Sequence, residues 1–142
     1  MPALVYITRR FEFAAAHRVY NPAWSDAQNT EVFGPCSNPM GHGHNYTLEV
    51  TIGGTPDPET GYVMDLRTLK KIVEEAVIQH LDHKHLNYDV PFLQGVIPST
   101  ENLIVAIWKE LEAALPPQVR LFRLRVWETA NNYFEYYGEK TD

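Results

Sequence analysis

Hydrophobic and polar positions alternate near both ends of the chain, which is the pattern of β-strands. Residues 4–13 are rich in β-branched and aromatic side chains, and residues 44–53 alternate apolar with polar side chains. The sequence GGTPDPETG follows the second of these segments, and it predicts a hairpin turn into a short strand at 62–64. Two further alternating segments, 120–127 and 133–137, predict the last two strands.

The central part of the chain shows the period of amphipathic helices instead. Asp65 is suited to cap a first helix, which is expected to end near Leu81. Its apolar positions recur at spacings of three and four: Leu66, Leu69, Ile72, Val73, Ala76 and Val77. The sequence LDHKHLNYDVPF, which covers residues 81–92, is expected to form a loop.

A second helix is predicted to begin at Ser99 or Thr100, because either side chain can cap it, and Glu101 adds a negative charge to the first turn. Its apolar stripe consists of Ile104, Ile107, Trp108, Leu111 and Leu115. Pro116 and Pro117 are expected to end this helix. By contrast, residues 21–43 carry Asn, Pro, Ser, Asp and Gly throughout and are expected to be a long irregular segment.

These elements predict one α+β domain that spans residues 1–142. The order ββααββ favours a four-stranded antiparallel sheet with two helices on one face. Four strands leave two open edges, which proteins cover, charge or pair with another chain. We expect the edges to pair between subunits and to close an oligomeric β-barrel.

Composition and charge exclude some classes of partner. The 142-residue chain has a formal net charge of −6, whereas a nucleic-acid-binding surface needs clustered Lys and Arg. The apolar run at 3–7 is too short for the core of a signal peptide, and no segment approaches the roughly 20 apolar residues of a membrane span. Cys36 is the only cysteine, so an intramolecular disulfide is excluded and the cytoplasm is the expected location.

A close pair of histidines provides the first candidate for chemistry. His42 and His44 lie two residues apart at the start of a predicted strand, so both imidazoles can face one metal ion. His17, at the end of the first predicted strand, could supply a third nitrogen. Three histidines with an open fourth position form a ligand set of catalytic zinc, so Zn²⁺ is the expected metal. The alternative is a chance pair of ordinary surface histidines.

Cys36 lies six residues before His42 and has three interpretations. It could be a fourth zinc ligand, a buried small hydrophobic residue, or a thiolate that acts as a base near the metal. A nearby zinc ion or imidazolium would lower the pKa of the thiol and favour the third role.

Carboxylates provide two further candidates. Asp82 precedes His83, where it can fix the tautomer of the imidazole and stabilise its cation; the alternative is a solvated cluster at a helix end. Glu128 ends an apolar strand, where it could accept two hydrogen bonds from a planar amino-heterocycle. A solvent-facing carboxylate at a sheet edge is the alternative for Glu128.

Six segments of the chain, in their order and at their spacing, resemble the family of 6-pyruvoyl-tetrahydropterin synthases and the related bacterial 6-carboxy-tetrahydropterin synthases. They are FEFAAAHR, VFGPCSNPMGHGHNY, DPETGYVMDL, LDHKHLN, STEN and WETANN. The resemblance covers nearly the whole chain. It implies the tunnelling fold and a homohexamer of two stacked trimers, with active sites at the subunit interfaces.

The resemblance also implies a role for each candidate side chain. The zinc ligands correspond to His17, His42 and His44. Cys36 corresponds to the catalytic base, and Asp82 and His83 complete the proton relay. The glutamate that anchors the pterin ring corresponds to Glu128, and the stretch beside the ring corresponds to Ser99, Thr100 and Glu101.

The reaction that the resemblance implies begins with 7,8-dihydroneopterin triphosphate. This substrate loses triphosphate, its side-chain hydroxyls become carbonyls and its ring is reduced, without an external redox cofactor. Five residues lie between Cys36 and His42, as in the pyruvoyl-forming enzymes of tetrahydrobiopterin biosynthesis, whereas the carboxy-forming enzymes have a shorter gap. The triphosphate needs cationic partners, for which Arg18 and Lys84 are candidates by position.

The pyruvoyl product is therefore predicted. One alternative is a 6-carboxy-tetrahydropterin synthase, which releases acetaldehyde and supplies queuosine and other deazaguanine pathways. The other is a pterin- or metal-binding protein without catalysis.

Overall fold

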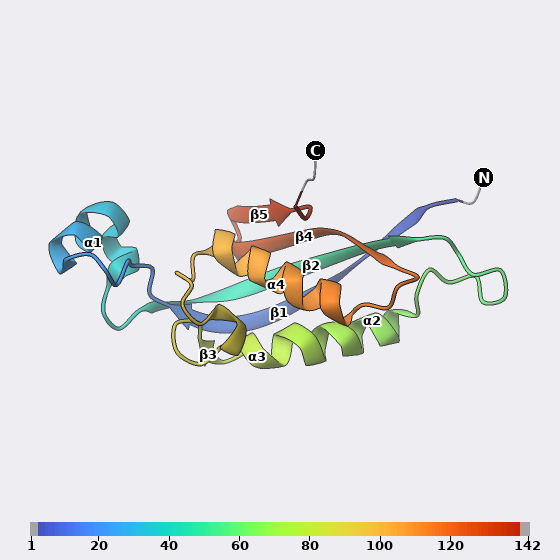
Figure 1. Cartoon of the computed structure of the whole chain (residues 1–142), viewed down its shortest axis with the longest axis horizontal. Coiled ribbons are helices and arrows are strands. Elements are labelled where there is room, and N and C mark those ends of the chain that lie inside the picture. The colour runs from blue at the N-terminus through green and yellow to red at the C-terminus, as the bar shows by residue number, and fades with distance from the viewer. Residues whose placement is uncertain (1–2, 140–142) are drawn as a thin grey trace.

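The computed structural model describes residues 3–139 and shows a long, twisted sheet with helices on one face (Figure 1). The strands are β1 (Val5–His17), β2 (His42–Gly54), β3 (Lys84–His85), β4 (Arg120–Thr129) and β5 (Asn132–Tyr136). The helices are α1 (Asp26–Phe33), α2 (Leu66–Val73), α3 (Gln79–Leu81) and α4 (Thr100–Ala114). A π-helical turn (Glu74–Ile78) joins α2 to α3. No helix within residues 3–139 combines the length and the apolar character needed to cross a membrane.

The sheet has five strands in the order β3-β1-β2-β4-β5, so the prediction of four antiparallel strands is wrong in number and in direction. Neighbouring strands are antiparallel except β3, which is parallel to β1. In β3, Lys84 and His85 pair with Ala15 and Ala16 inside the predicted loop 81–92. Two residues are too few for a sequence period to reveal. Within the described residues the sheet is open, with β3 and β5 at its edges.

The short strand predicted at 62–64 does not form. Strand β2 lies between β1 and β4, so both of its edges are already paired and a hairpin partner cannot add to it. The chain instead makes a compact turn, in which the Asp57 N–H donates to the Tyr62 carbonyl at 2.9 Å and the Gly61 N–H donates to the Asp57 carbonyl at 2.7 Å. Gly61 has a φ of 77°, a backbone conformation that favours glycine.

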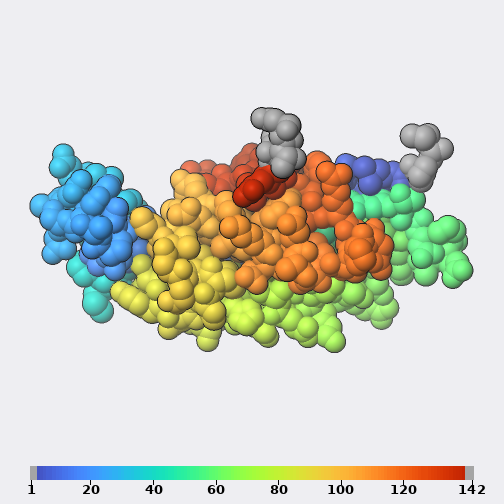
Figure 2. Space-filling view, in the orientation of Figure 1, coloured from blue at the N-terminus to red at the C-terminus, as the bar shows by residue number. Residues whose placement is uncertain are grey.

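Residues 21–43 are not wholly irregular, because they contain α1 and a 3-10 turn at Gly34–Ser37. Ser25 caps α1 by accepting the Gln28 N–H at 3.1 Å. Only Asn29 is buried in α1, so this helix lacks the apolar stripe by which sequence periodicity identifies a helix. Figures 1 and 2 show α1 beyond the end of the sheet, on an arm that projects from the rest of the molecule.

Helices α2, α3 and α4 cover one face of the sheet, as predicted (Figure 1). Along α2 and α3 the fully buried side chains recur every four residues: Leu69, Val73, Val77 and Leu81. A spacing of four exceeds the ~3.6 residues of an α-helical turn, and the wider π-helical turn between the two helices keeps these positions facing the sheet. They pack in one core with side chains of the strands and of α4, among them Tyr46, Leu48, Ile52, Leu103, Ile107, Leu111, Leu124 and Val126.

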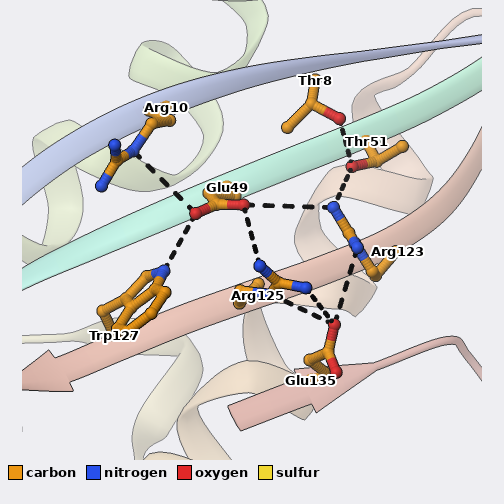
Figure 3. A network of polar contacts seen from close by, with 8 residues as sticks. All are labelled: Thr8, Arg10, Glu49, Thr51, Arg123, Arg125, Trp127 and Glu135. Atoms are coloured by element: carbon orange, nitrogen blue, oxygen red, sulfur yellow. Dashed lines mark hydrogen bonds and ion pairs between the residues drawn. The ribbon is translucent and has the colours of Figure 1, made fainter. Parts of the chain in front are cut away.

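The opposite face of the sheet carries a polar network centred on Glu49 of β2 (Figure 3). Its neighbours come from both adjacent strands: Arg10 of β1, and Arg123, Arg125 and Trp127 of β4. The Trp127 indole N–H donates to the Glu49 carboxylate at 2.9 Å, and guanidinium nitrogens of the three arginines lie within 4.0 Å of it. Arg125 extends the network to Glu135 of β5 at 2.9 Å. Charged side chains therefore connect four strands on the face without helices.

Candidate active site

Three histidine side chains meet where β1 ends and β2 begins. His17 pairs with His42 across the two strands, and His44 lies two residues further along β2, so the three side chains share one face of the sheet. The Nε2 atoms of His17 and His42 are 3.1 Å apart. One ring nitrogen from each histidine lies within 4.8 Å of the other two. The structure thus brings together the three residues that the sequence selects as metal ligands.

The surroundings of this histidine group favour neutral imidazoles, the form that binds a metal ion. Burial is the largest cause that lowers the pKa of His17 and of His44, and the nearby His42 ring lowers both further. The His17 Nδ1 lies 2.8 Å from the Pro98 carbonyl oxygen. Because a carbonyl only accepts, Nδ1 carries the proton and the lone pair of Nε2 faces the other two histidines.

A second feature of the group fits a bound cation. The Nε2 atom of His44 is buried and has no hydrogen-bond partner within residues 3–139. Buried polar atoms are seldom left without a partner, and a metal ion held jointly with His17 and His42 would provide one. Imidazole nitrogens suit Zn²⁺ and several other transition-metal ions, so the donor set fits a transition metal.

Cys36 lies in the 3-10 turn that follows α1, and its side chain is exposed. The Val19 N–H donates to the Cys36 carbonyl at 2.8 Å, and the Arg18 Nε–H donates to the Ser37 carbonyl at 2.8 Å. Arg18 also lies over the Tyr20 ring at 3.7 Å from its centroid. The thiol is not part of the three-histidine group that the described residues form. The structure therefore argues against Cys36 as a fourth metal ligand or a buried hydrophobic residue in a single chain.

Asp82 and His83 form a hydrogen-bonded pair at the end of α3. The Asp82 Oδ1 atom lies 3.0 Å from the His83 Nδ1 and accepts the Ala14 N–H at 2.9 Å. The backbone hydrogen bond from Ala14 is the main cause that lowers the pKa of Asp82. His83 has a φ of 61°, and its side chain is 83% exposed. An ionised carboxylate thus holds an imidazole whose second nitrogen is open to solvent.

The structure keeps this pair apart from the thiol. Asp82 and His83 are hydrogen-bonded to the backbone of Ala14 in β1. The backbone of Cys36 is hydrogen-bonded to Val19, which lies beyond the end of that strand. At a rise of about 3.3 Å per residue, the strand from Ala14 to its last residue alone spans about 10 Å. An open pocket of about 510 Å³ is lined by both His44 and His83 but not by Cys36. Among the described residues, Cys36 thus neither lines this pocket nor forms a close group with Asp82 and His83.

Glu128 lies beside the histidine group, near the end of β4. The Thr100 hydroxyl donates to the Glu128 Oε2, and the Glu128 Oε1 lies 3.9 Å from the His44 Nε2. The Glu128 side chain is 23% exposed, whereas Thr100, the first residue of α4, is buried. Glu128 is therefore a half-buried carboxylate held by a hydroxyl and not a freely solvated edge residue.

The two neighbours of Thr100 are used differently. Ser99 caps α4 by accepting the Asn102 N–H at 3.2 Å, so its hydroxyl serves the helix. Glu101 is exposed in the first turn. Lys84, a candidate for triphosphate binding, is also exposed. Of the stretch STE, only the Thr100 side chain is joined to the Glu128 carboxylate.

Tyr46 belongs to the same site, although it is not among the residues selected from the sequence. It lies two residues after His44 on the same face of β2, and its ring lies edge-on to His44 with centroids 5.5 Å apart. Burial and the negative charge of Glu128 raise the pKa of the Tyr46 phenol, and an interaction with the Thr100 hydroxyl opposes them. Strand alternation in HGHNY was the signal that could have identified it.

Comparison with known proteins gives the family. Residues 6–139 match the model of a family described as 6-pyruvoyl tetrahydropterin synthase. A human protein named 6-pyruvoyl tetrahydrobiopterin synthase is 50% identical over 133 residues, which cover 94% of this chain and 91% of the human protein. A Dictyostelium discoideum protein of the same name is 41% identical over 139 residues, which cover 98% of this chain and 100% of that protein.

A solved structure agrees with these matches. The structure of 6-pyruvoyl tetrahydropterin synthase from Caenorhabditis elegans superposes with a TM-score of 0.90 at 37% sequence identity and covers 97% of this chain and 98% of that chain. The α+β fold and the sequence matches lead to the same assignment: this chain belongs to the 6-pyruvoyl tetrahydropterin synthase family.

Proposed function

We propose that the protein is a zinc-dependent 6-pyruvoyl-tetrahydropterin synthase, a lyase that converts 7,8-dihydroneopterin triphosphate to 6-pyruvoyl-tetrahydropterin and triphosphate. The observation that carries the proposal is the position of Glu128, whose carboxylate lies 3.9 Å from His44 at the edge of the three-histidine group. If Glu128 binds the pterin ring of the substrate, the three-carbon side chain of the substrate would lie beside the metal ligands. The site that recognises the pterin ring and the site that acts on the substrate's side chain would then adjoin.

The histidines would hold Zn²⁺ through His17, His42 and His44. When bound, zinc would act as a Lewis acid that increases the acidity of the carbon–hydrogen bonds next to the substrate's side-chain oxygens. Cys36, as a thiolate, would remove a proton from carbon at its Sγ. His83 would move protons at its exposed Nε2, while Asp82 holds its Nδ1 at 3.0 Å and stabilises the imidazolium.

Glu128 would orient the ring. Each carboxylate oxygen can accept more than one hydrogen bond, so the Thr100 hydroxyl at Oε2 leaves capacity for the 2-amino group and the adjacent ring N–H of a pterin. Two parallel hydrogen bonds from one ring edge fix its direction as well as its position. Such orientation removes much of the entropic cost of bringing the side chain to the reacting groups.

Product analysis tests this proposal directly. Zinc-loaded protein would be incubated with 7,8-dihydroneopterin triphosphate, and triphosphate release and pterin mass would be followed together. The expected product keeps the three-carbon side chain. A product shortened by two carbons, with acetaldehyde, would assign the protein to the carboxy-forming branch, and an unchanged ligand that binds only with zinc would indicate a protein without catalysis.

We further propose that the active protein is a homohexamer of two stacked trimers. Strands β3 and β5 leave two open edges in the described part of the sheet, and pairing of β5 with a neighbouring subunit would continue the sheet into a closed barrel. The thiol of Cys36 and the pair Asp82–His83 are attached at different parts of β1. A neighbouring subunit would supply the half of the proton relay that each chain lacks near its own metal site.

Mixing of two inactive variants tests the shared site. Cys36→Ala and His83→Ala are each expected to be inactive alone. When the two are co-expressed and assemble at random, half of the subunits carry an intact Cys36 and the other half an intact His83. A site that takes Cys36 from one subunit and His83 from its neighbour is then complete in about a quarter of cases, so about a quarter of the wild-type activity should return. The measurement is triphosphate release per subunit. Co-expression of Cys36→Ala with a variant that carries both substitutions is the control, and it should stay inactive. Absence of recovery in the first mixture would place the relay within one chain.

A further inference from the structure

The half-buried side chain of Asn87 binds the backbone at the point where β1 ends. The Arg18 N–H donates to the Asn87 Oδ1 at 2.8 Å, and the Asn87 Nδ2–H donates to the Arg18 carbonyl at 2.9 Å. Arg18 directly follows His17, the last residue of β1. An amide offers one acceptor and donors side by side, so the Asn87 side chain pairs with Arg18 as a neighbouring strand would.

Arg18 and the residue after it are in turn bound to the turn that carries the thiol. The Val19 N–H donates to the Cys36 carbonyl at 2.8 Å, and the Arg18 Nε–H donates to the Ser37 carbonyl at 2.8 Å. The backbone of Cys36 therefore has a fixed place relative to Arg18 and Val19. Because Asn87 binds Arg18, this part of the chain also has a fixed place relative to the sheet.

The base of the arm formed by residues 18–41 determines where the arm points. The arm projects beyond the end of the sheet (Figures 1 and 2). Its helix α1 buries only Asn29, and the Asn29 side chain binds the backbone of Asn21, which also belongs to the arm. A change in the direction of the chain at Arg18 would therefore carry Cys36 with it.

We infer that Asn87 is a positioning residue, which sets the direction in which the arm leaves the sheet and thereby places the Cys36 thiol for proton transfer. This inference rests on the proposed function, because it takes Cys36 to be the base. Asn87 lies four residues after His83, and the carboxylate of Asp82 binds β1 as well. One short segment thus places both the thiol and the Asp82–His83 pair relative to β1. Asn87 itself does not touch the reacting atoms; it acts through the backbone of Arg18.

Asn87→Ala removes both hydrogen bonds and should lower kcat about 10- to 100-fold, since displacement of a reacting group by about 1 Å can cost ~100-fold in rate. KM, neopterin binding followed by fluorescence, and zinc content should stay at the wild-type values. The reason is that His17 is held separately, by its pairing with His42 and by the Pro98 carbonyl.

Two further variants complete this comparison. Asn87→Asp keeps an acceptor for the Arg18 N–H but loses the donor, so its kcat should lie between those of the wild type and Asn87→Ala. It tests the same role with a smaller change to the fold. Gln79→Ala is the matched control, because the exposed Gln79 amide also donates to a backbone carbonyl, that of Glu75 in the helical segment at 2.9 Å. This control should turn over at the wild-type rate.

A spin label tests the route of the effect through the arm. Cys36 is the only cysteine and is exposed, so a nitroxide can be attached there selectively. In Asn87→Ala the electron paramagnetic resonance spectrum of this nitroxide should show higher mobility than in the otherwise unchanged protein. Gln79→Ala should leave the spectrum as it is. A reduced kcat with unchanged mobility of the label would overturn the route through the arm.

Cys36→Ala separates the inference from the proposal on which it rests. Normal turnover by Cys36→Ala would refute the base and with it the role of Asn87. If Cys36→Ala loses turnover while Asn87→Ala keeps the wild-type kcat, the base stands and only the role of Asn87 is refuted. A higher KM or a loss of zinc in Asn87→Ala would also refute that role, because the substitution would then act on the substrate site or on the histidine group.

Discussion

Replacement of His42 by alanine is expected to remove the bound metal and to lower kcat by at least ~1000-fold, because Lewis-acid stabilisation contributes several kcal/mol. The Nε2 atom of His42 lies 3.1 Å from that of His17, and replacement of His42 would leave only His17 and His44 in the group. Two imidazoles that remain cannot complete a catalytic zinc site. The measurements are metal content by mass spectrometry and triphosphate release under saturating substrate.

His80→Ala is the matched control for this loss. His80 lies in α3, beside Phe92 at 6.4 Å between ring centroids, and is outside the three-histidine group. Its replacement should change neither metal content nor kcat. A His42→Ala protein that retains one metal ion per chain would refute the assignment of this ligand.

The pH dependence of metal binding follows from the same group. Only neutral imidazoles bind, and burial lowers the pKa of His17 and His44. Protons therefore compete for the nitrogens of His17 and His44 at a lower pH than they do for an ordinary histidine, whose pKa is about 6.5. Metal affinity should accordingly decline as the pH falls through the range in which histidines are protonated, and these two ligands should contribute to the decline at its lower end; competition with a chelator at several pH values would measure it.

Replacement of Cys36 by alanine should have the second large effect, a loss of about 100- to 10,000-fold in kcat with the metal retained, the range expected for a general base. The thiol is exposed on its 3-10 turn and stands apart from the histidine group. Its removal therefore affects proton transfer without disturbing the metal ligands or the core. Single-turnover triphosphate release and metal content would be measured on the same samples.

Met40→Ala is the appropriate control, because Met40 is 90% exposed and precedes β2 in the same arm. This variant should turn over at the wild-type rate. Normal turnover by Cys36→Ala would refute the role of Cys36 as the base. Loss of metal from Cys36→Ala would instead show that the thiol takes part in metal binding in the assembled protein.

Much of the fold could be predicted from the sequence because its long elements bury regular stripes. The caps of α2 and α4 at Asp65 and Ser99 are confirmed, as are the helices on one face of the sheet. The errors concern elements whose stability does not come from a periodic pattern. Strand β3 depends on pairing with the end of β1, and α1 buries only Asn29. The strand predicted at 62–64 does not form because β1 and β4 already pair with both edges of β2, and a local sequence pattern does not specify this order of strands.

The candidate site was predictable where its residues are close in the chain or repeat along a strand. His42 and His44 are two residues apart, and their register with β1 brings in His17. The Thr100–Glu128 hydrogen bond joins the start of α4 to the end of β4, and such a contact depends on tertiary packing. Tyr46 was missed because a tyrosine on a buried strand face is ordinarily part of a core. Its unpaired hydroxyl becomes visible only when its surroundings are known.

The charged network on the open face of the sheet also specifies the alignment of β2 with β4. Glu49 and Arg125 are direct cross-strand partners, and a slip of β4 by one residue would turn Arg125 toward the apolar core and away from Glu49, since neighbouring side chains on a strand face opposite sides. Burial of charges without their partners is strongly unfavourable. The same alignment holds His44 and Glu128 on the inner face at 3.9 Å. The ion pairs around Glu49 contact no ligand, but they disfavour a shifted alignment of β2 and β4. In such an alignment the proposed metal site at His44 and the proposed pterin site at Glu128 would no longer lie side by side.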